Sequence, residues 1–124
     1  MSELKVTTLS NQSGVTVPVD TVISGTAKAW VNFNGTGTVA IRRAFNVASI
    51  TDNGTGDYTV NFTAAMVDAN YSICGQASLG AGGTDPRIFG AAGSDPTDSS
   101  FEVATTTNGG IQENCEYVCV TIFS

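Results

Sequence analysis

The carboxylates of this chain are the side chains with the most potential for chemistry. Two of them facing each other across a cleft could act as the acid and the nucleophile of a glycosidase. The candidates are Asp52, Asp57, Asp85, Asp95, Asp98, Glu113 and Glu116. Nearly all of them stand beside Gly, Pro, Asn or Ser, where an aspartate commonly stabilises a turn through its own backbone. The turn interpretation is therefore favoured over the catalytic one.

Histidine is absent from the sequence. It is the commonest general base, the usual partner of a serine or cysteine nucleophile and the commonest metal ligand. The three cysteines, Cys74, Cys115 and Cys119, match no zinc spacing. They are interpreted as small, buried, reduced side chains, with a bridge from Cys115 or Cys119 to Cys74 as the alternative. The sequence thus predicts no enzyme, no metal site and no cofactor.

Two loops have part of a ligand-binding pattern. Residues 52–57, DNGTGD, spread oxygen ligands over six positions but lack the bidentate glutamate and regular spacing of an EF-hand, so a hairpin turn is favoured. The glycine-rich run 80–83 precedes neither a helix nor a lysine, so it does not predict a phosphate-binding loop.

Composition limits the partners. Only 13% of the 124 residues are charged, and the formal net charge is −6 with five cations. Nucleic-acid binding needs a basic surface, so we do not expect it. No apolar run approaches the length of a membrane span, and the first eight residues lack the features of a signal peptide. We expect one domain, made in a cytoplasm and not inserted into a membrane.

The elements that must position any site follow a β pattern. Apolar residues alternate around positions 39–41, 45–49 and 58–62. Asn34-Gly35 fits the two positive-φ positions of a type I′ hairpin turn, and residues 52–57 form a longer turn of the same chemistry. Together these features predict a three-stranded antiparallel meander.

Further strands are expected at residues 70–76, 87–90, 101–105 and 117–123. Residues 63–68 are the only stretch that could form a short helix, and its six residues fit a loop equally well. About nine strands at short, regular spacing favour an all-β fold, an antiparallel β-sandwich or jelly roll. Residues 27–124 would form this domain, with its long loops between residues 79 and 115.

Two segments are expected to make assembly contacts. The Val-rich arm 1–26, interrupted by Pro18, cannot bury itself, so it should pack along an edge of the domain or pair with a neighbouring chain. The last strand is apolar on both faces and should be covered on both sides. The predicted interface residues are Val15, Val17, Val19, Val118, Val120 and Ile122.

Residues 27–75 resemble a recurrent module of the tail fibres and related tail proteins of tailed bacteriophages. The resemblance lies in the words AWVNFNGTG, SITDNGTGDYTVNF and MVDANY, and residues 9–26 resemble the segment that leads into the module. It covers most of residues 7–76. It implies a homotrimeric virion protein, made in the cytoplasm of the bacterial host and located in the phage tail. Distal loops of such fibres contact glycans or proteins of the host surface.

Two functions follow as hypotheses. In the first, the loops 79–87, 93–100 and 106–114 of a tail fibre or fibre tip bind cell-surface carbohydrate. Their hydrogen-bonding side chains would be Asp85, Arg87, Asp95, Asp98, Asn108 and Gln112. In the second, the chain is a small decoration or adaptor protein of the capsid or tail, with residues 1–26 and 117–123 buried against other virion subunits.

Overall fold

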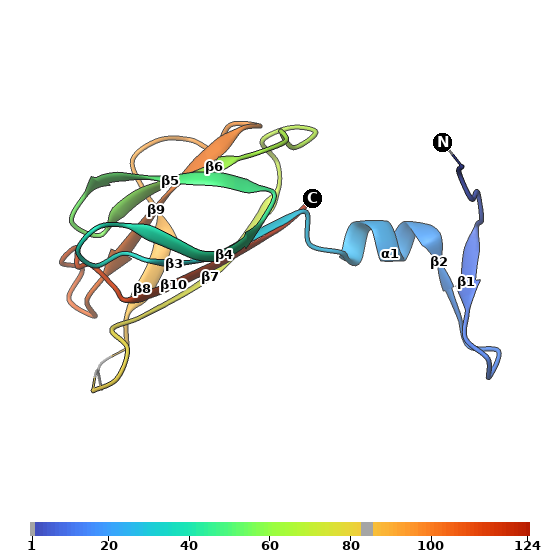
Figure 1. The fold of residues 1–124 in the computed structure, drawn as a ribbon, viewed down its shortest axis with the longest axis horizontal. Helices are drawn as coiled ribbons and strands as arrows, with labels where there is room; N and C mark the ends of the chain where they lie inside the picture. Colours follow the sequence, from blue (N-terminus) through green and yellow to red (C-terminus); the bar gives the residue numbers. More distant parts are fainter. Residues whose placement is uncertain (1, 83–85) are drawn as a thin grey trace.

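The computed structural model describes residues 2–82 and 86–124 and has two parts, an arm and a β-sandwich (Figure 1). The arm holds β1 (Thr8–Ser10), β2 (Thr16–Pro18) and α1 (Val19–Gly25). The sandwich strands are β3 (Ala29–Asn34), β4 (Ala40–Phe45), β5 (Val47–Gly54), β6 (Asp57–Phe62), β7 (Ser72–Ser78), β8 (Ile88–Ala91), β9 (Ser100–Thr106) and β10 (Tyr117–Phe123).

Two four-stranded antiparallel sheets face each other in the sandwich. We call them the β3 sheet, with the order β4-β3-β10-β7, and the β6 sheet, with the order β5-β6-β9-β8. Every pairing within them is antiparallel. The predicted all-β sandwich is confirmed, as are the strands predicted near residues 70–76, 87–90, 101–105 and 117–123.

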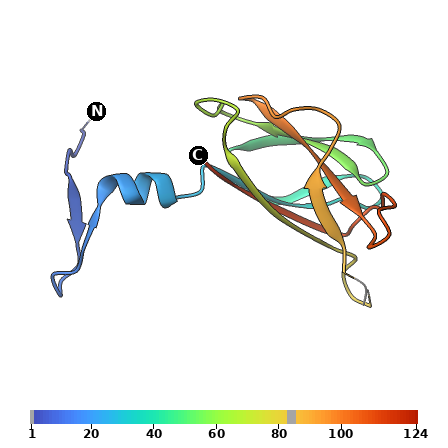
Figure 2. The same cartoon turned by 180° about the vertical axis from the view of Figure 1, so that it is seen from behind.

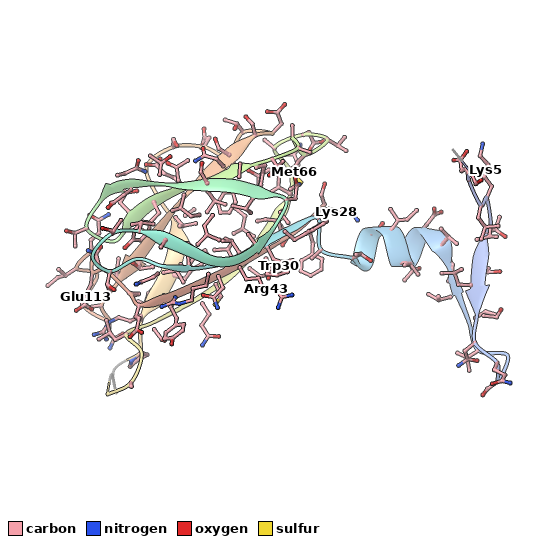
Figure 3. The ribbon with its side chains drawn as sticks, in the orientation of Figure 1. Lys5, Lys28, Trp30, Arg43, Met66 and Glu113 are labelled. Atoms are coloured by element: carbon pink, nitrogen blue, oxygen red, sulfur yellow. The ribbon has the colours of Figure 1, made fainter. Side chains whose placement is uncertain are left out.

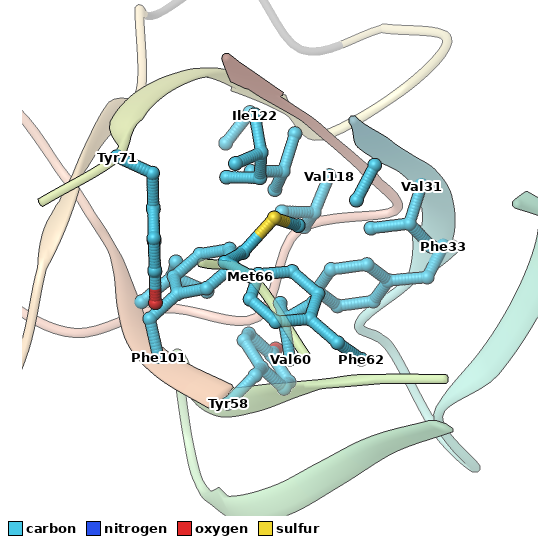
Figure 4. Close-up of a cluster of buried hydrophobic side chains, with 14 of the residues drawn as sticks. Val31, Phe33, Tyr58, Val60, Phe62, Met66, Tyr71, Phe101, Val118 and Ile122 are labelled. Carbon is cyan, nitrogen blue, oxygen red and sulfur yellow. The ribbon is translucent and has the colours of Figure 1, made fainter. Parts of the chain in front are cut away.

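The core lies between the sheets because alternate residues of the central strands point inward. Phe33 of β3 packs edge to face on Tyr58 of β6, with ring centroids 5.2 Å apart (Figure 4). Phe62, Tyr71 and Phe101 form a second aromatic group, with centroids 5.6 to 6.0 Å apart. Each such ring contributes about 1.5–3 kcal/mol through burial.

The predicted meander is wrong at its middle strand. β4 ends at Phe45 in one sheet and β5 begins at Val47 in the other. Asn46 makes the crossing with φ of 53°, a left-handed conformation that asparagine tolerates better than most residues. Its side chain donates to the carbonyls of Lys28 and Ala64 and accepts from the Ala64 N–H at 2.8 Å. The β5–β6 hairpin is confirmed.

The type I′ turn predicted at Asn34-Gly35 is also wrong. The residue with positive φ in this turn is Gly37, at 59°. Asn34 instead accepts a hydrogen bond from the Thr36 N–H at 2.9 Å. Gly35 is needed for space, because a Cβ there would lie 2.5 Å from the Tyr58 hydroxyl oxygen.

The arm projects away from the sandwich, as Figures 1 and 2 show from two sides. It does not pack along the domain edge, so that expectation is wrong, whereas pairing with a neighbouring chain stays a prediction. β1 and β2 pair through only three residue pairs, and α1 has no buried residue. The helix was not expected here, and the stretch 63–68, which the sequence left open between a short helix and a loop, is a loop.

Candidate functional site

The sandwich has two ends with different loops. The arm-proximal end holds the start of β3, the C-terminal Ser124 and the loops 63–71 and 92–99. The arm-distal end holds the turns 35–39 and 55–56, residues 79–82 and 86–87 of the loop 79–87, and the loop 107–116. Strand registers fix this division, since Ala29 pairs with Ile122 near the arm and Phe33 pairs with Val118 away from it. In Figure 3, Lys28 and Met66 lie near the arm and Glu113 lies at the opposite end.

The predicted glycan-binding residues divide between these two ends. Arg87, Asn108 and Gln112 lie at the arm-distal end. Asp95 and Asp98 lie in the arm-proximal loop 92–99, where the Met66 N–H donates to the Asp98 carbonyl at 2.8 Å. Asp85 lies outside the described residues. The structure therefore brings two of the three predicted loops together and places the third at the other end.

Arg87 and Asn108 line a shallow depression of about 340 Å³ at the arm-distal end, with Pro86, Thr107 and Gly109. The Arg87 side chain is only 7% exposed, and its Nε lies 2.5 Å from Glu113 Oε2. The guanidinium is therefore held in place and cannot reach far into solvent. Glu113 was assigned only to a turn, and its ion pair with Arg87 was missed because the two are distant in sequence.

Loop 107–116 is attached to the sheets by partly buried hydrogen bonds. The Thr105 hydroxyl donates to the Glu113 carbonyl at 2.6 Å, and the Glu113 N–H donates back to the Thr105 carbonyl at 2.9 Å. Asn114 Oδ1 accepts from the Gly56 N–H at 2.7 Å, which ties the loop to the β5–β6 turn. A loop held in this way presents its tip in one orientation.

Tyr58 of β6 contributes two further hydrogen bonds to this network. Its hydroxyl lies 2.8 Å from Asn114 Oδ1 and 2.9 Å from the Gly35 carbonyl oxygen. Burial, with a smaller contribution from the charge of Asp52, raises the pKa of Tyr58 to about 12. The hydroxyl therefore stays protonated and acts as a donor at neutral pH.

The tip of loop 107–116 is a tight turn closed by the Thr107 N–H donating to the Ile111 carbonyl at 2.8 Å. Asn108 and Gln112 are exposed on it. Ile111 is 71% exposed between them, and sequence reasoning missed it. The tip thus offers amide groups that can hydrogen-bond hydroxyls, beside an apolar side chain.

Burial corrects part of the predicted assembly surface. Val118, Val120 and Ile122 are core residues, buried against the β6 sheet, so they are not available to a partner. The outward residues of β10 are Tyr117, Cys119, Thr121 and Phe123. In the arm, Val15 is exposed and Val17 and Val19 are half-buried, and their role in assembly stays a prediction.

The cysteines are free thiols. Burial raises the pKa of Cys115, whereas Cys74 is exposed on the outer face of β7, contrary to the prediction that all three are buried. Asp52 has the predicted turn role, accepting a hydrogen bond from the Gly54 N–H at 3.0 Å.

A larger depression of about 600 Å³ lies where the arm joins the sandwich, between Ile23, Lys28, Met66 and Val67. Within residues 2–82 and 86–124, no cluster of three or more His, Cys, Asp or Glu side chains could hold a metal ion. Over the same ranges, no helix has the length and apolar character needed to cross a membrane.

Comparison of the chain with protein families, curated proteins and solved structures gave no match.

Proposed function

We propose that this chain is a structural protein of a phage virion, a tail fibre or fibre-tip module that binds glycan on the host cell surface. The observation that carries the proposal is the position of the arm at one end of the sandwich and of residues 79–82, 86–87 and 107–116 at the other (Figure 1). A protein built in this way can attach at one end and bind at the other. The resemblance to phage tail proteins supports the same assignment.

The arm-distal surface has the chemistry of a sugar-binding site. Amide side chains donate to and accept from sugar hydroxyls, and both Asn108 and Gln112 are exposed beside the depression at Arg87. Ile111 adds an apolar surface that can contact the carbon face of a sugar ring. Binding rather than catalysis is the function proposed, since these groups recognise a ligand without a nucleophile or a paired acid and base.

The test is binding of the labelled protein to intact host cells and to oligosaccharide released from their surface. Asn108→Ala with Gln112→Ala should weaken binding about tenfold or more, because two hydrogen-bonding side chains are lost. Asp95→Ala with Asp98→Ala is the matched control at the arm-proximal end and should bind normally. Equal binding by both double variants would refute the assignment of the site.

A structural role alone, as a decoration or adaptor protein, is the second candidate. The arm favours it, since Leu9 is exposed on a two-stranded ribbon that is marginal by itself and Leu4 and Val15 are exposed beside that ribbon. Such an arm should be cut by protease in the free protein and protected in the virion. Protection together with no binding to cells would favour this candidate over the first.

A further inference from the structure

The two sheets of the sandwich differ in what they present to the outside. The outer face of the β6 sheet is polar and internally hydrogen-bonded: Asn61 Nδ2 donates to the hydroxyls of Ser49 and Thr51 at 3.2 and 3.0 Å. On the same face, Asn53 Nδ2 donates to the Thr59 hydroxyl at 2.9 Å. This face therefore presents hydroxyls and amides held in fixed positions.

The outer face of the β3 sheet is aromatic and basic. We call it the aromatic face and define it by Trp30, Arg42, Arg43, Phe45, Tyr117 and Phe123. Trp30 pairs with Phe45, which is 54% exposed, and on its other side with Thr121, so large side chains lie next to one another across neighbouring strands. In Figure 3, Trp30 and Arg43 lie on the side of the sheet away from the core.

Two arginine side chains add to the difference between the outer faces of the two sheets. The Arg42 guanidinium lies 4.1 Å from the centroid of the Tyr117 ring and donates to the Glu116 carbonyl at 2.6 Å. Arg42 also forms an ion pair with Glu116 at 3.8 Å, so Arg43 supplies the net positive charge of the face. Tryptophan, tyrosine and arginine are the residues most enriched at the energetic centres of protein interfaces. An aromatic face on one sheet beside a polar face on the other indicates that the first is covered in the working assembly.

The charges on the other sheet indicate which partner fits the aromatic face. After Arg43 the only cation in the sequence is Arg87, which is paired with Glu113, so the strands of the β6 sheet carry no Lys or Arg. The outer face of the β6 sheet carries Asp57 and Glu102 instead, because both residues alternate with core residues of β6 and β9. The chain therefore contains an acidic face complementary to its own basic one.

We propose that the aromatic face packs against the acidic outer face of the β6 sheet of a second copy of this chain. Two different faces then meet, so each copy can bind one neighbour on each side, and repetition closes into a ring if the rotation allows. Aromatic area supplies most of the affinity, and the charges select the orientation. The inference does not rest on host binding, and its failure would leave the arm-distal site untouched.

Four variants of the purified full chain test the contact by light scattering. Phe45→Asp should weaken association at least about tenfold, the effect expected of a central aromatic contact. Thr51→Lys should weaken it too, by placing a cation on the outer face of the β6 sheet, whereas Thr51→Asp should be tolerated. Val67→Asp changes a side chain that is 94% exposed at the arm-proximal end, and it should leave association intact. Circular dichroism serves as the control that each variant is folded.

The reactivity of Cys74 gives an independent test of the contact. Cys74 is exposed and pairs with Thr121, which pairs on its other side with Trp30. Its alkylation by a maleimide, located by mass spectrometry, should be slow in the wild-type assembly and fast in Phe45→Asp. A monomeric wild-type protein, or an assembly that survives Phe45→Asp with Cys74 still reactive, overturns the proposal. Loss of association in Val67→Asp alone also overturns it and moves the contact to the arm-proximal end.

Discussion

At the scale of single residues, a few side chains keep the candidate site in place without touching any ligand. Tyr58, Thr105 and Asn114 connect loop 107–116 to the turns beside it through short hydrogen bonds in the interior. The tip that carries Asn108 and Gln112 therefore has little freedom to move. A change below the surface should weaken binding even where the surface itself is unchanged.

Tyr58 makes stability depend on pH in the alkaline range. An unfolded tyrosine has its usual pKa near 10, whereas burial raises the folded value to about 12. In the folded state Tyr58 therefore keeps its proton to higher pH. The contribution of the protonated hydroxyl to stability is complete below pH 10 and is lost as the pH rises toward 12. The predicted loss is at most about 3 kcal/mol.

Urea unfolding of wild type and Tyr58→Phe from pH 8 to 12 measures this effect. Burial raises the pKa of Tyr71 and Cys115 as well, so both proteins should lose stability, and the wild type more steeply. At pH 8 the variant should be less stable by about 1–3 kcal/mol, because the Gly35 carbonyl loses the Tyr58 hydroxyl as a donor and Asn114 keeps only the Gly56 N–H. Parallel pH curves would contradict the assignment to Tyr58.

Gly75 tests the contact between the sheets. A Cβ at this position would lie 2.3 Å from a ring carbon of Phe89, so β8 can close over β7 only beside glycine. Gly75→Ala should lower the free energy of unfolding by about 1–3 kcal/mol through overpacking. The same change in a Phe89→Ala background should have a smaller effect, since the clashing ring is gone. Equal effects in the two backgrounds would argue against this contact.

At the scale of elements, the connection at Asn46 decides the topology. One residue with positive φ and three hydrogen bonds carries the chain from β4 in one sheet to β5 in the other. Asn46→Ala should be less stable than Asn46→Gly by about 1 kcal/mol, because glycine keeps the left-handed conformation and alanine does not. Both should be less stable than the wild type. Equal stability of the two variants in urea would show that backbone conformation at this position is not decisive.

The strands could be predicted because alternation of buried and exposed residues is a local signal. The sheet change at Asn46 could not, since an apolar residue on either side of it continues the same alternation. α1 was missed because it is short, rich in β-branched residues and without buried contacts that would mark a helical face. β10 is apolar on both faces, so its sequence does not tell which face joins the core.

The candidate site was predictable in part. The loops were predicted from their polar residues, but only the structure places residues 79–82, 86–87 and 107–116 at one end and 92–99 at the other. A signal was available: in an antiparallel series of strands, successive loops alternate between the two ends. The ion pair of Arg87 with Glu113 and the exposure of Ile111 depend on contacts between distant segments, which no local pattern reveals.

At the scale of the whole molecule, the two ends of the sandwich and its aromatic face have separate tasks in our account. The arm attaches, the arm-distal loops bind and the aromatic face joins copies of the chain. Joining several copies would place several identical loop surfaces together, and avidity would then strengthen weak binding to a repetitive glycan surface. Phe45→Asp should therefore lower binding to intact cells much more than binding to a single free oligosaccharide.

Hydrogen–deuterium exchange tests the central claim, host binding by the arm-distal end, most directly. Exchange would be measured on the full chain with and without oligosaccharide released from the host surface. We predict slower exchange in residues 107–112 on addition of the oligosaccharide, with residues 63–71 and 92–99 unchanged. Slower exchange confined to the arm-proximal loops, or no change anywhere at saturating oligosaccharide, would contradict the account.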